Sequence, residues 1–203
     1  MSQIPALVGG RALVHGIGMH VDHGAGNSSK MYVGGQATAA VTAGTTTASS
    51  TAENMCSQYT IPANTLVAGS TVRVRFAVVS ADENGSDTLI VRLRFGSNGS
   101  TMTSDTECAV NTAVDQADAD FSVGDMVVQC RTKGSSGTGV AFGTIADSDA
   151  LGSKLVSAQF EPSFTINTTV ANYVSVTTTW DASHADNEAT TQAFIVDIVN
   201  PQT

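Results

Sequence analysis

Histidine and aspartate residues near the start of the chain have side chains that could bind a metal ion. In the segment VHGIGMHVDHG, His15, His20, Asp22 and His23 offer three imidazoles and one carboxylate, which are ligand types that zinc and related metals use. The spacing matches no common metal site, the segment is rich in glycine, and no cysteine lies near it. We therefore expect these residues to belong to an arm that contacts neighbouring molecules, with a metal site as the alternative.

Three further clusters contain residue types used in catalysis or ion binding. Carboxylates gather in residues 115–120 (DQADAD) and 147–149 (DSD), where they could hold Ca²⁺ although EF-hand spacing is absent. The segment WDASHADNEA brings a serine, His184 and aspartates together, but catalytic triads are assembled across a fold and no nucleophile elbow is present. Residues 134–139 (GSSGTG) lack the ending of a phosphate-binding loop. We expect loops here, with no cofactor and no enzymatic activity, and calcium binding stays open.

Four of the nine basic residues lie in two short, similar segments, TVRVRF (residues 71–76) and IVRLRF (residues 90–95). Alternation places their arginines on the face opposite the apolar side chains. The turn-forming segment SADENGSD lies between them and predicts a β-hairpin. In that hairpin Arg73 would lie opposite Arg94 and Arg75 opposite Arg92.

Such a ladder of like charges needs anionic partners, because directly opposed like charges destabilise a sheet. One hypothesis is internal neutralisation, with Asp197 on the outward side of the last strand as a candidate. The other is that the arginine forks bind carboxylates of a neighbouring subunit or protein. We expect an interface formed by Arg73, Arg75, Arg92 and Arg94, with internal neutralisation as the alternative.

Short segments of period two follow residue 57 and predict an all-β fold. Besides the two arginine-containing segments, strands are expected near residues 121–130, 140–146, 164–166, 174–180 and 194–198. The apolar parity changes within residues 121–130, which predicts a bulge at Gly124 and Asp125. About eight short strands separated by loops favour an antiparallel β-sandwich of the jelly-roll type.

Composition divides the chain into two parts. Residues 1–56 are rich in Gly, Ala and Thr with few large apolar groups, and predict an extended arm, whereas residues 57–203 contain the predicted sandwich. The net charge of −9 argues against nucleic-acid binding. The start of the chain lacks a signal-peptide pattern, no apolar run is long enough to span a bilayer, and the three cysteines show no metal or disulfide spacing. We expect free, buried thiols and no membrane partner.

Several sequence segments within residues 57–200 resemble a jelly-roll domain found in structural proteins of tailed bacteriophages. They are YTIPANTLVAGSTVRVRF, TLIVRLRFG, ADFSVGDMVVQCRTKGSSGTGVAFGT and VSVTTTWDASHADNEATTQAFIVDIV. The resemblance implies a non-enzymatic virion protein, assembled in the host cytoplasm, that decorates or cements the capsid. It also implies a homo-oligomer, expected to be a trimer, bound to the major capsid protein or another virion protein. The alternative is a receptor- or carbohydrate-binding module of a head or tail fibre, although the chain has only one Trp and three Tyr for sugar stacking.

Overall fold

The structure is a computed structural model that describes residues 19–22, 28–31, 46–48, 50–81, 86–115, 119–148 and 154–199. These residues form β-strands almost throughout, with one short 3₁₀ helix, η1 (Gly99–Ser104). In these ranges no helix is long and apolar enough to cross a membrane.

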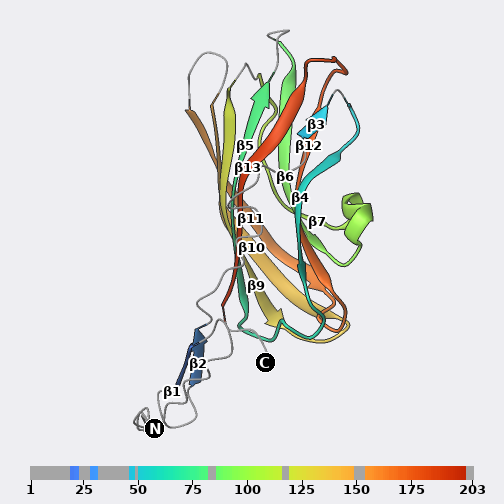
Figure 1. The fold of residues 1–203 in the computed structure, drawn as a ribbon. Coiled ribbons are helices and arrows are strands. Elements are labelled where there is room, and N and C mark those ends of the chain that lie inside the picture. The colour runs from blue at the N-terminus through green and yellow to red at the C-terminus, as the bar shows by residue number, and fades with distance from the viewer. Residues whose placement is uncertain are drawn as a thin grey trace, which may run out of the picture.

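Two antiparallel sheets pack face to face as a β-sandwich (Figure 1). The first has the order β11-β10-β9-β5-β13-β3, and the second has the order β4-β12-β6-β7 with the short β8 also paired to β6. Their bounds are β3 (Thr46–Ala48), β4 (Asn54–Ile61), β5 (Thr71–Ala81), β6 (Thr88–Gly96), β7 (Thr106–Val110), β8 (Val114–Asp115), β9 (Phe121–Thr132), β10 (Gly137–Ser148), β11 (Lys154–Ile166), β12 (Asn172–Trp180) and β13 (Glu188–Val199). A separate two-stranded sheet pairs β1 (Met19–Asp22) with β2 (Ser28–Met31).

Strand connectivity identifies the sandwich as a jelly roll. Eight strands form two four-stranded halves, β3-β13-β5-β9 and β4-β12-β6-β7. Every connection between consecutive members of this set crosses from one sheet to the other, except that from β6 to β7. Such double-sheet crossing is the jelly-roll pattern, so the predicted fold class is confirmed. β10 and β11 are additional: they form a hairpin that extends the first sheet beyond β9.

The core lies between the two sheets and follows the period-two pattern of the sequence. The expected inward residues of β5, β6, β12 and β13 are buried, except that Ile198 of β13 is partly buried, and Trp180 is among the largest fully buried side chains. Phe95 of β6 and Phe164 of β11 pack edge to face with their ring centroids 6.0 Å apart, a favoured aromatic geometry. Cys56, Cys108 and Cys130 are buried thiols that form no disulfide, as predicted.

The predicted hairpin between β5 and β6 is wrong. β5 pairs with β13 and β9, whereas β6 pairs with β12, β7 and β8 in the other sheet. Two amphipathic strands joined by a turn-rich segment can bury their apolar faces as neighbours in one sheet. They bury them equally well in opposing sheets that pack across the core. Alternation alone therefore does not tell hydrogen-bonded neighbours from strands in opposing sheets.

The predicted bulge in β9 is also wrong. β9 keeps one register with β5 from Phe121 to Gln129, and Gly124 lies on its buried side. A Cβ atom at Gly124 would come within 2.2 Å of the Phe76 ring, so glycine is required here by packing. The apolar alternation of the sequence shifts here because Val123 faces solvent. Gly124 takes the next inward position, and the Phe76 ring occupies the space that a side chain there would need.

The expected boundary between residues 56 and 57 lies inside β4, which begins at Asn54. The three-residue strand β3 also joins the first sheet by pairing with β13. The sandwich thus includes residues that the composition assigned to the arm. Most of the arm lies outside the described residues.

Candidate protein-interaction surface

The four arginines do not form one ladder. Arg73 and Arg75 project from β5 in the first sheet, whereas Arg92 and Arg94 project from β6 in the second. Each pair points outward, as predicted, but the two pairs lie on opposite sides of the sandwich because their strands belong to opposing sheets. The opposition of Arg73 to Arg94 and of Arg75 to Arg92 is therefore wrong.

Arg94 forms a largely buried ion pair with Glu53. The Arg94 Nη2 atom donates to Glu53 Oε2 at 2.7 Å, Nε donates to Oε1, and Nη1 donates to the Asp105 carbonyl at 3.0 Å. The Arg94 and Glu53 side chains are only 11% and 12% exposed, and the Thr177 hydroxyl also donates to Glu53. All nitrogens of the Arg94 fork are used within the chain.

Burial and hydrogen bonding act against each other on the Glu53 carboxyl group. Burial alone raises the pKa of Glu53, but the hydrogen bonds from Arg94 and Thr177, with the charges of Arg94 and Arg92, outweigh it and lower that pKa. The hydrogen bond to Glu53 raises the pKa of Arg94. The pair thus remains ionised at neutral pH and holds the segment before β4 against the second sheet.

Further polar contacts lie on the solvent-facing side of the second sheet. Arg92 donates to Glu107 at 3.0 Å and to the Thr179 hydroxyl at 2.9 Å. The Gln58 amide donates to the Ser175 hydroxyl and to the carbonyl of Gly99 in η1. Since Arg92 and Arg94 have partners inside the chain, neither provides the free arginine fork that the interface hypothesis requires.

The opposite side of the molecule differs. We call the solvent-facing side of the six-stranded sheet its outer face. Strand register aligns its side chains in three rows that run from β11 through β10, β9 and β5 to β13. The rows are Phe160, Phe142, Val127, Arg73 and Asp197; Ala158, Thr144, Asp125, Arg75 and Ile195; and Val156, Ala146, Val123, Ala77 and Ala193.

Charge is balanced within these rows. Two arginines, Arg73 and Arg75, stand against two aspartates, Asp125 and Asp197, so the rows sum to zero while the whole chain carries −9. The Arg75 Nε atom lies 3.6 Å from Asp125 Oδ2 and both side chains are exposed, whereas Asp197 lies directly across from Arg73 in the register. Exposed pairs of this kind are weak, and their partners can be exchanged for groups of a binding protein.

The β10 and β11 end of the outer face is apolar and open to solvent. Phe160 and Val156 are each 68% exposed and Phe142 is 45% exposed. Phe160 and Phe142 are register partners on neighbouring strands, and Val127 is next in the same row, so the three form one continuous apolar area that Ala158 and Val156 extend along β11. Large exposed apolar patches are typical of interaction sites. A single exposed Phe in each of two segments carries no signal in the sequence until β10 and β11 are paired.

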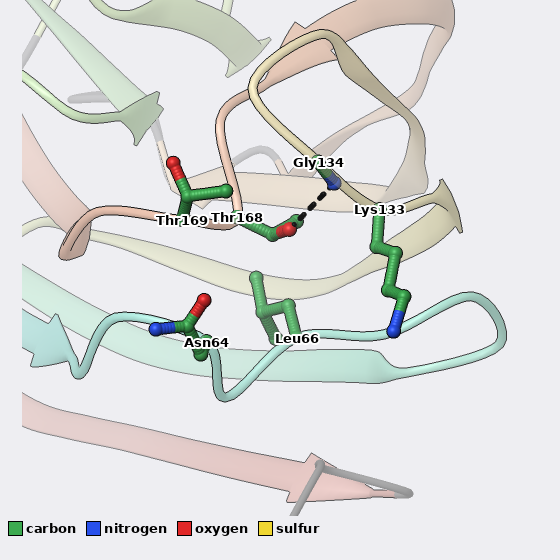
Figure 2. Close-up of a pocket in the computed structure, with 6 residues that line it drawn as sticks. All are labelled: Asn64, Leu66, Lys133, Gly134, Thr168 and Thr169. Carbon is green, nitrogen blue, oxygen red and sulfur yellow. Dashed lines mark hydrogen bonds between the residues drawn. The ribbon is translucent and has the colours of Figure 1, made fainter.

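A small pocket lies at the end of the sandwich where β9 turns into β10 (Figure 2). It is lined by Asn64, Leu66, Lys133, Gly134, Thr168 and Thr169. The Thr168 hydroxyl accepts a hydrogen bond from the Gly134 amide at 2.8 Å, and the Lys133 chain borders the opening (Figure 2). At about 230 Å³ the pocket is below the roughly 300–1,000 Å³ of ordinary small-molecule sites, and its lining has no aromatic ring.

The remaining sequence candidates give no assembled site in the described ranges. His184 Nδ1 lies 3.3 Å from Asp87 Oδ2, and the Asn187 amide donates to the same Asp87 oxygen at 2.8 Å. The partner of His184 is therefore the residue just before β6, far from the segment WDASHADNEA in the sequence. Some of these candidates lie outside the described residues, namely His15, His23 and residues 116–118 and 149. Among the described residues, no group of three His, Cys, Asp or Glu side chains could hold a metal ion.

Comparisons with known proteins give little further information. No protein-family model matches the chain, and no curated protein is similar to it. Among solved structures, the marine PL7 alginate lyase AlyA1 from Zobellia galactanivorans matches 70% of this chain and 65% of its own, at 10% sequence identity and a TM-score of 0.27. The match spans less than two thirds of that enzyme and is too weak to inform activity. The jelly-roll assignment thus depends on the strand order, and the chain is assigned to no family.

Proposed function

We propose that this protein is a non-enzymatic structural component of a tailed-bacteriophage virion, a decoration or cement protein that binds the capsid lattice. The observation that carries the proposal is the exposed apolar area of Phe142, Phe160 and Val156. It lies on a hairpin added to the eight-stranded jelly roll, where it contributes to neither half of the basic sandwich. The assignment to a virion comes from the resemblance of residues 57–200 to a jelly-roll domain of structural proteins of tailed bacteriophages.

The outer face is the proposed docking surface, and its occupant is the major capsid protein or another protein of the virion lattice. Fully buried interface cores are apolar and depleted in charge, with a polar rim that fixes orientation. Phe142 and Phe160 fit the core of such an interface, while Arg73 and Arg75 fit its rim, because arginine forks bind carboxylates in two-point contacts. The interface expected for all four arginines is thereby reduced to this pair.

A direct experiment is to purify particles from the host that makes this chain and quantify their proteins by mass spectrometry. The proposal predicts this chain in gradient-purified virions at a fixed ratio to the major capsid protein. Recovery of the chain only from the soluble lysate, with none in washed virions, would contradict it. Immunogold labelling of the same particles separates a head from a tail position.

The receptor- or carbohydrate-binding alternative receives less support. Trp180 is buried in the core, and the pocket of Figure 2 offers hydrogen-bonding groups without an aromatic ring on which a sugar could stack. Binding sites for small ligands usually combine both features.

A further inference from the structure

β11 is an edge strand with unusual exposure. It is the outermost strand of the first sheet, so in the described part of the chain nothing pairs with its outer edge. Its segment LVSAQF, residues 155–160, contains no charge, proline or glycine, although natural edge strands use such residues to prevent pairing with other chains. The opposite edge of this sheet, β3, has only three residues. Residues 155–160 are thus an uncharged stretch at the sheet edge, bounded within β11 by Lys154 on one side and by Glu161 and Pro162 on the other.

We propose that β11 pairs with β11 of a second copy of this chain, antiparallel, about a two-fold axis at Ala158. A two-fold axis perpendicular to a sheet places each residue opposite one that is equally far from the centre on the other side. Val156 of each copy then lies opposite Phe160 of the other, and the two Ala158 residues face each other. Aromatic residues paired with β-branched residues are favourable cross-strand neighbours.

The exposure pattern favours this register. Val156 and Phe160 share the outer face with Ala158, lie two residues to either side of it, and are both 68% exposed. Centring the pairing one residue earlier or later would place Val156 opposite Ala158 or Pro162 and would leave the two large side chains apart. Pairing centred on Ala158 covers one side of both the Val156 and the Phe160 side chain.

Charge also favours a second copy as the occupant. Two molecules that each carry −9 repel one another, so self-association requires a region with little net charge. Residues 155–160 carry none, the flanking residues Lys154 and Glu161 have opposite charges, and the nearest charged residues of the rows, Asp125 and Arg75, form a pair with each other. Pairing also joins the apolar areas, because Val156 of one copy comes next to the Phe160 and Phe142 row of the other.

The resulting assembly is a two-fold dimer whose first sheets form one continuous sheet with both outer faces on the same side. This differs from the trimer that the phage resemblance implies, and a closed isologous contact explains why pairing stops at two copies. The inference does not rest on a virion role, since it concerns the isolated protein.

Cysteine cross-linking of the full chain tests the register. In Ala158→Cys the two sulfurs meet at the axis within disulfide range, so mild oxidation is expected to convert most of the protein to a covalent dimer within minutes. Thr144→Cys is the matched control, because Thr144 lies beside Ala158 on β10 and faces the same side one strand farther from the axis. The native thiols are buried, and burial raises the pKa of Cys108 and Cys130, so they should stay unreactive.

Two further variants make the result decisive. Val156→Cys and Phe160→Cys should cross-link when mixed and not when each is oxidised alone. Val156→Lys, which places a charge at the edge, should shift the light-scattering mass from twice 20.8 kDa to the monomer mass while leaving the circular dichroism spectrum unchanged. Overturning results are a wild-type monomer or trimer in solution, or cross-linking of Ala158→Cys no faster than that of Thr144→Cys.

Discussion

Replacing Arg94 with alanine is expected to lower the free energy of unfolding by about 3 kcal/mol at pH 7, because removing one partner of a buried ion pair strands the other charge. Glu53, only 12% exposed, would keep the Thr177 hydroxyl and lose its cation. Urea denaturation followed by Trp180 fluorescence measures the change. The matched control is Arg75→Ala, whose exposed pair with Asp125 should contribute less than about 1 kcal/mol.

The effect of Arg94→Ala should depend on pH in a defined direction. The pKa of Glu53 is lowered in the folded protein from 4.5, so its ionisation stabilises the fold above about that pH, and the stabilisation is lost as the pH falls through the folded pKa. Without Arg94 the burial of Glu53 raises its pKa, and protonation relieves the defect. The difference between wild type and variant should therefore shrink as the pH falls, beginning above pH 4.5, where Glu53 of the variant takes up its proton, and continuing below pH 4.5, where the wild-type carboxyl does so.

A double variant separates the ion pair from packing. Glu53→Gln with Arg94→Met removes both charges and should be more stable than Arg94→Ala, since no unpaired ion remains. Equal stability losses for Arg94→Ala and Arg75→Ala, without pH dependence, would contradict the structural role assigned to the pair.

Replacing Phe142 with aspartate is expected to weaken attachment to particles by roughly thirtyfold or more, because a central aromatic residue of an interface typically contributes at least 2 kcal/mol. The change puts a carboxylate beside Phe160 and Val127 in the first row of the outer face. Co-sedimentation of purified protein with particles stripped of it gives the binding curve. Thermal unfolding should be nearly unchanged, since Phe142 is 45% exposed.

Val170→Asp is the control for that variant. Val170 is also an exposed apolar residue, but it lies between β11 and β12, away from the outer-face rows. It should bind particles as the wild type does. If Phe142→Asp and Val170→Asp both bound normally, the outer face would not be the attachment surface.

Sequence periodicity predicted β5, β6, β12 and β13 and their inward faces, but it predicted only residues 164–166 of β11 and neither β4 nor β7. It failed where the answer depends on which strands are neighbours: β5 and β6 alternate as hairpin strands do, yet they lie in opposing sheets. The predicted opposition of the arginines was wrong for the same reason, since Arg73 lies across from Asp197 and not from Arg94. Alternation fixes the face of a residue, but only the register fixes its cross-strand partner.

The segment before β4 shows the same limit. Glu53 is the only charged residue between Lys30 and Arg73, and it provides the carboxylate for Arg94. Its isolation was a usable signal in the sequence, because a single acidic residue in a long uncharged stretch indicates a specific contact for its carboxylate. Its partner could not be deduced, since the contact joins residues far apart in the sequence and depends on the folded sheet.

Cryo-electron microscopy of virions that contain this protein would show the attachment surface itself. We expect jelly-roll density on the particle with β9, β10, β11 and β5 facing the underlying lattice, and with Phe142 and Phe160 buried against a virion protein. Density that shows this face open to solvent, with the sandwich attached through the side that carries Arg92 and Arg94, would contradict it.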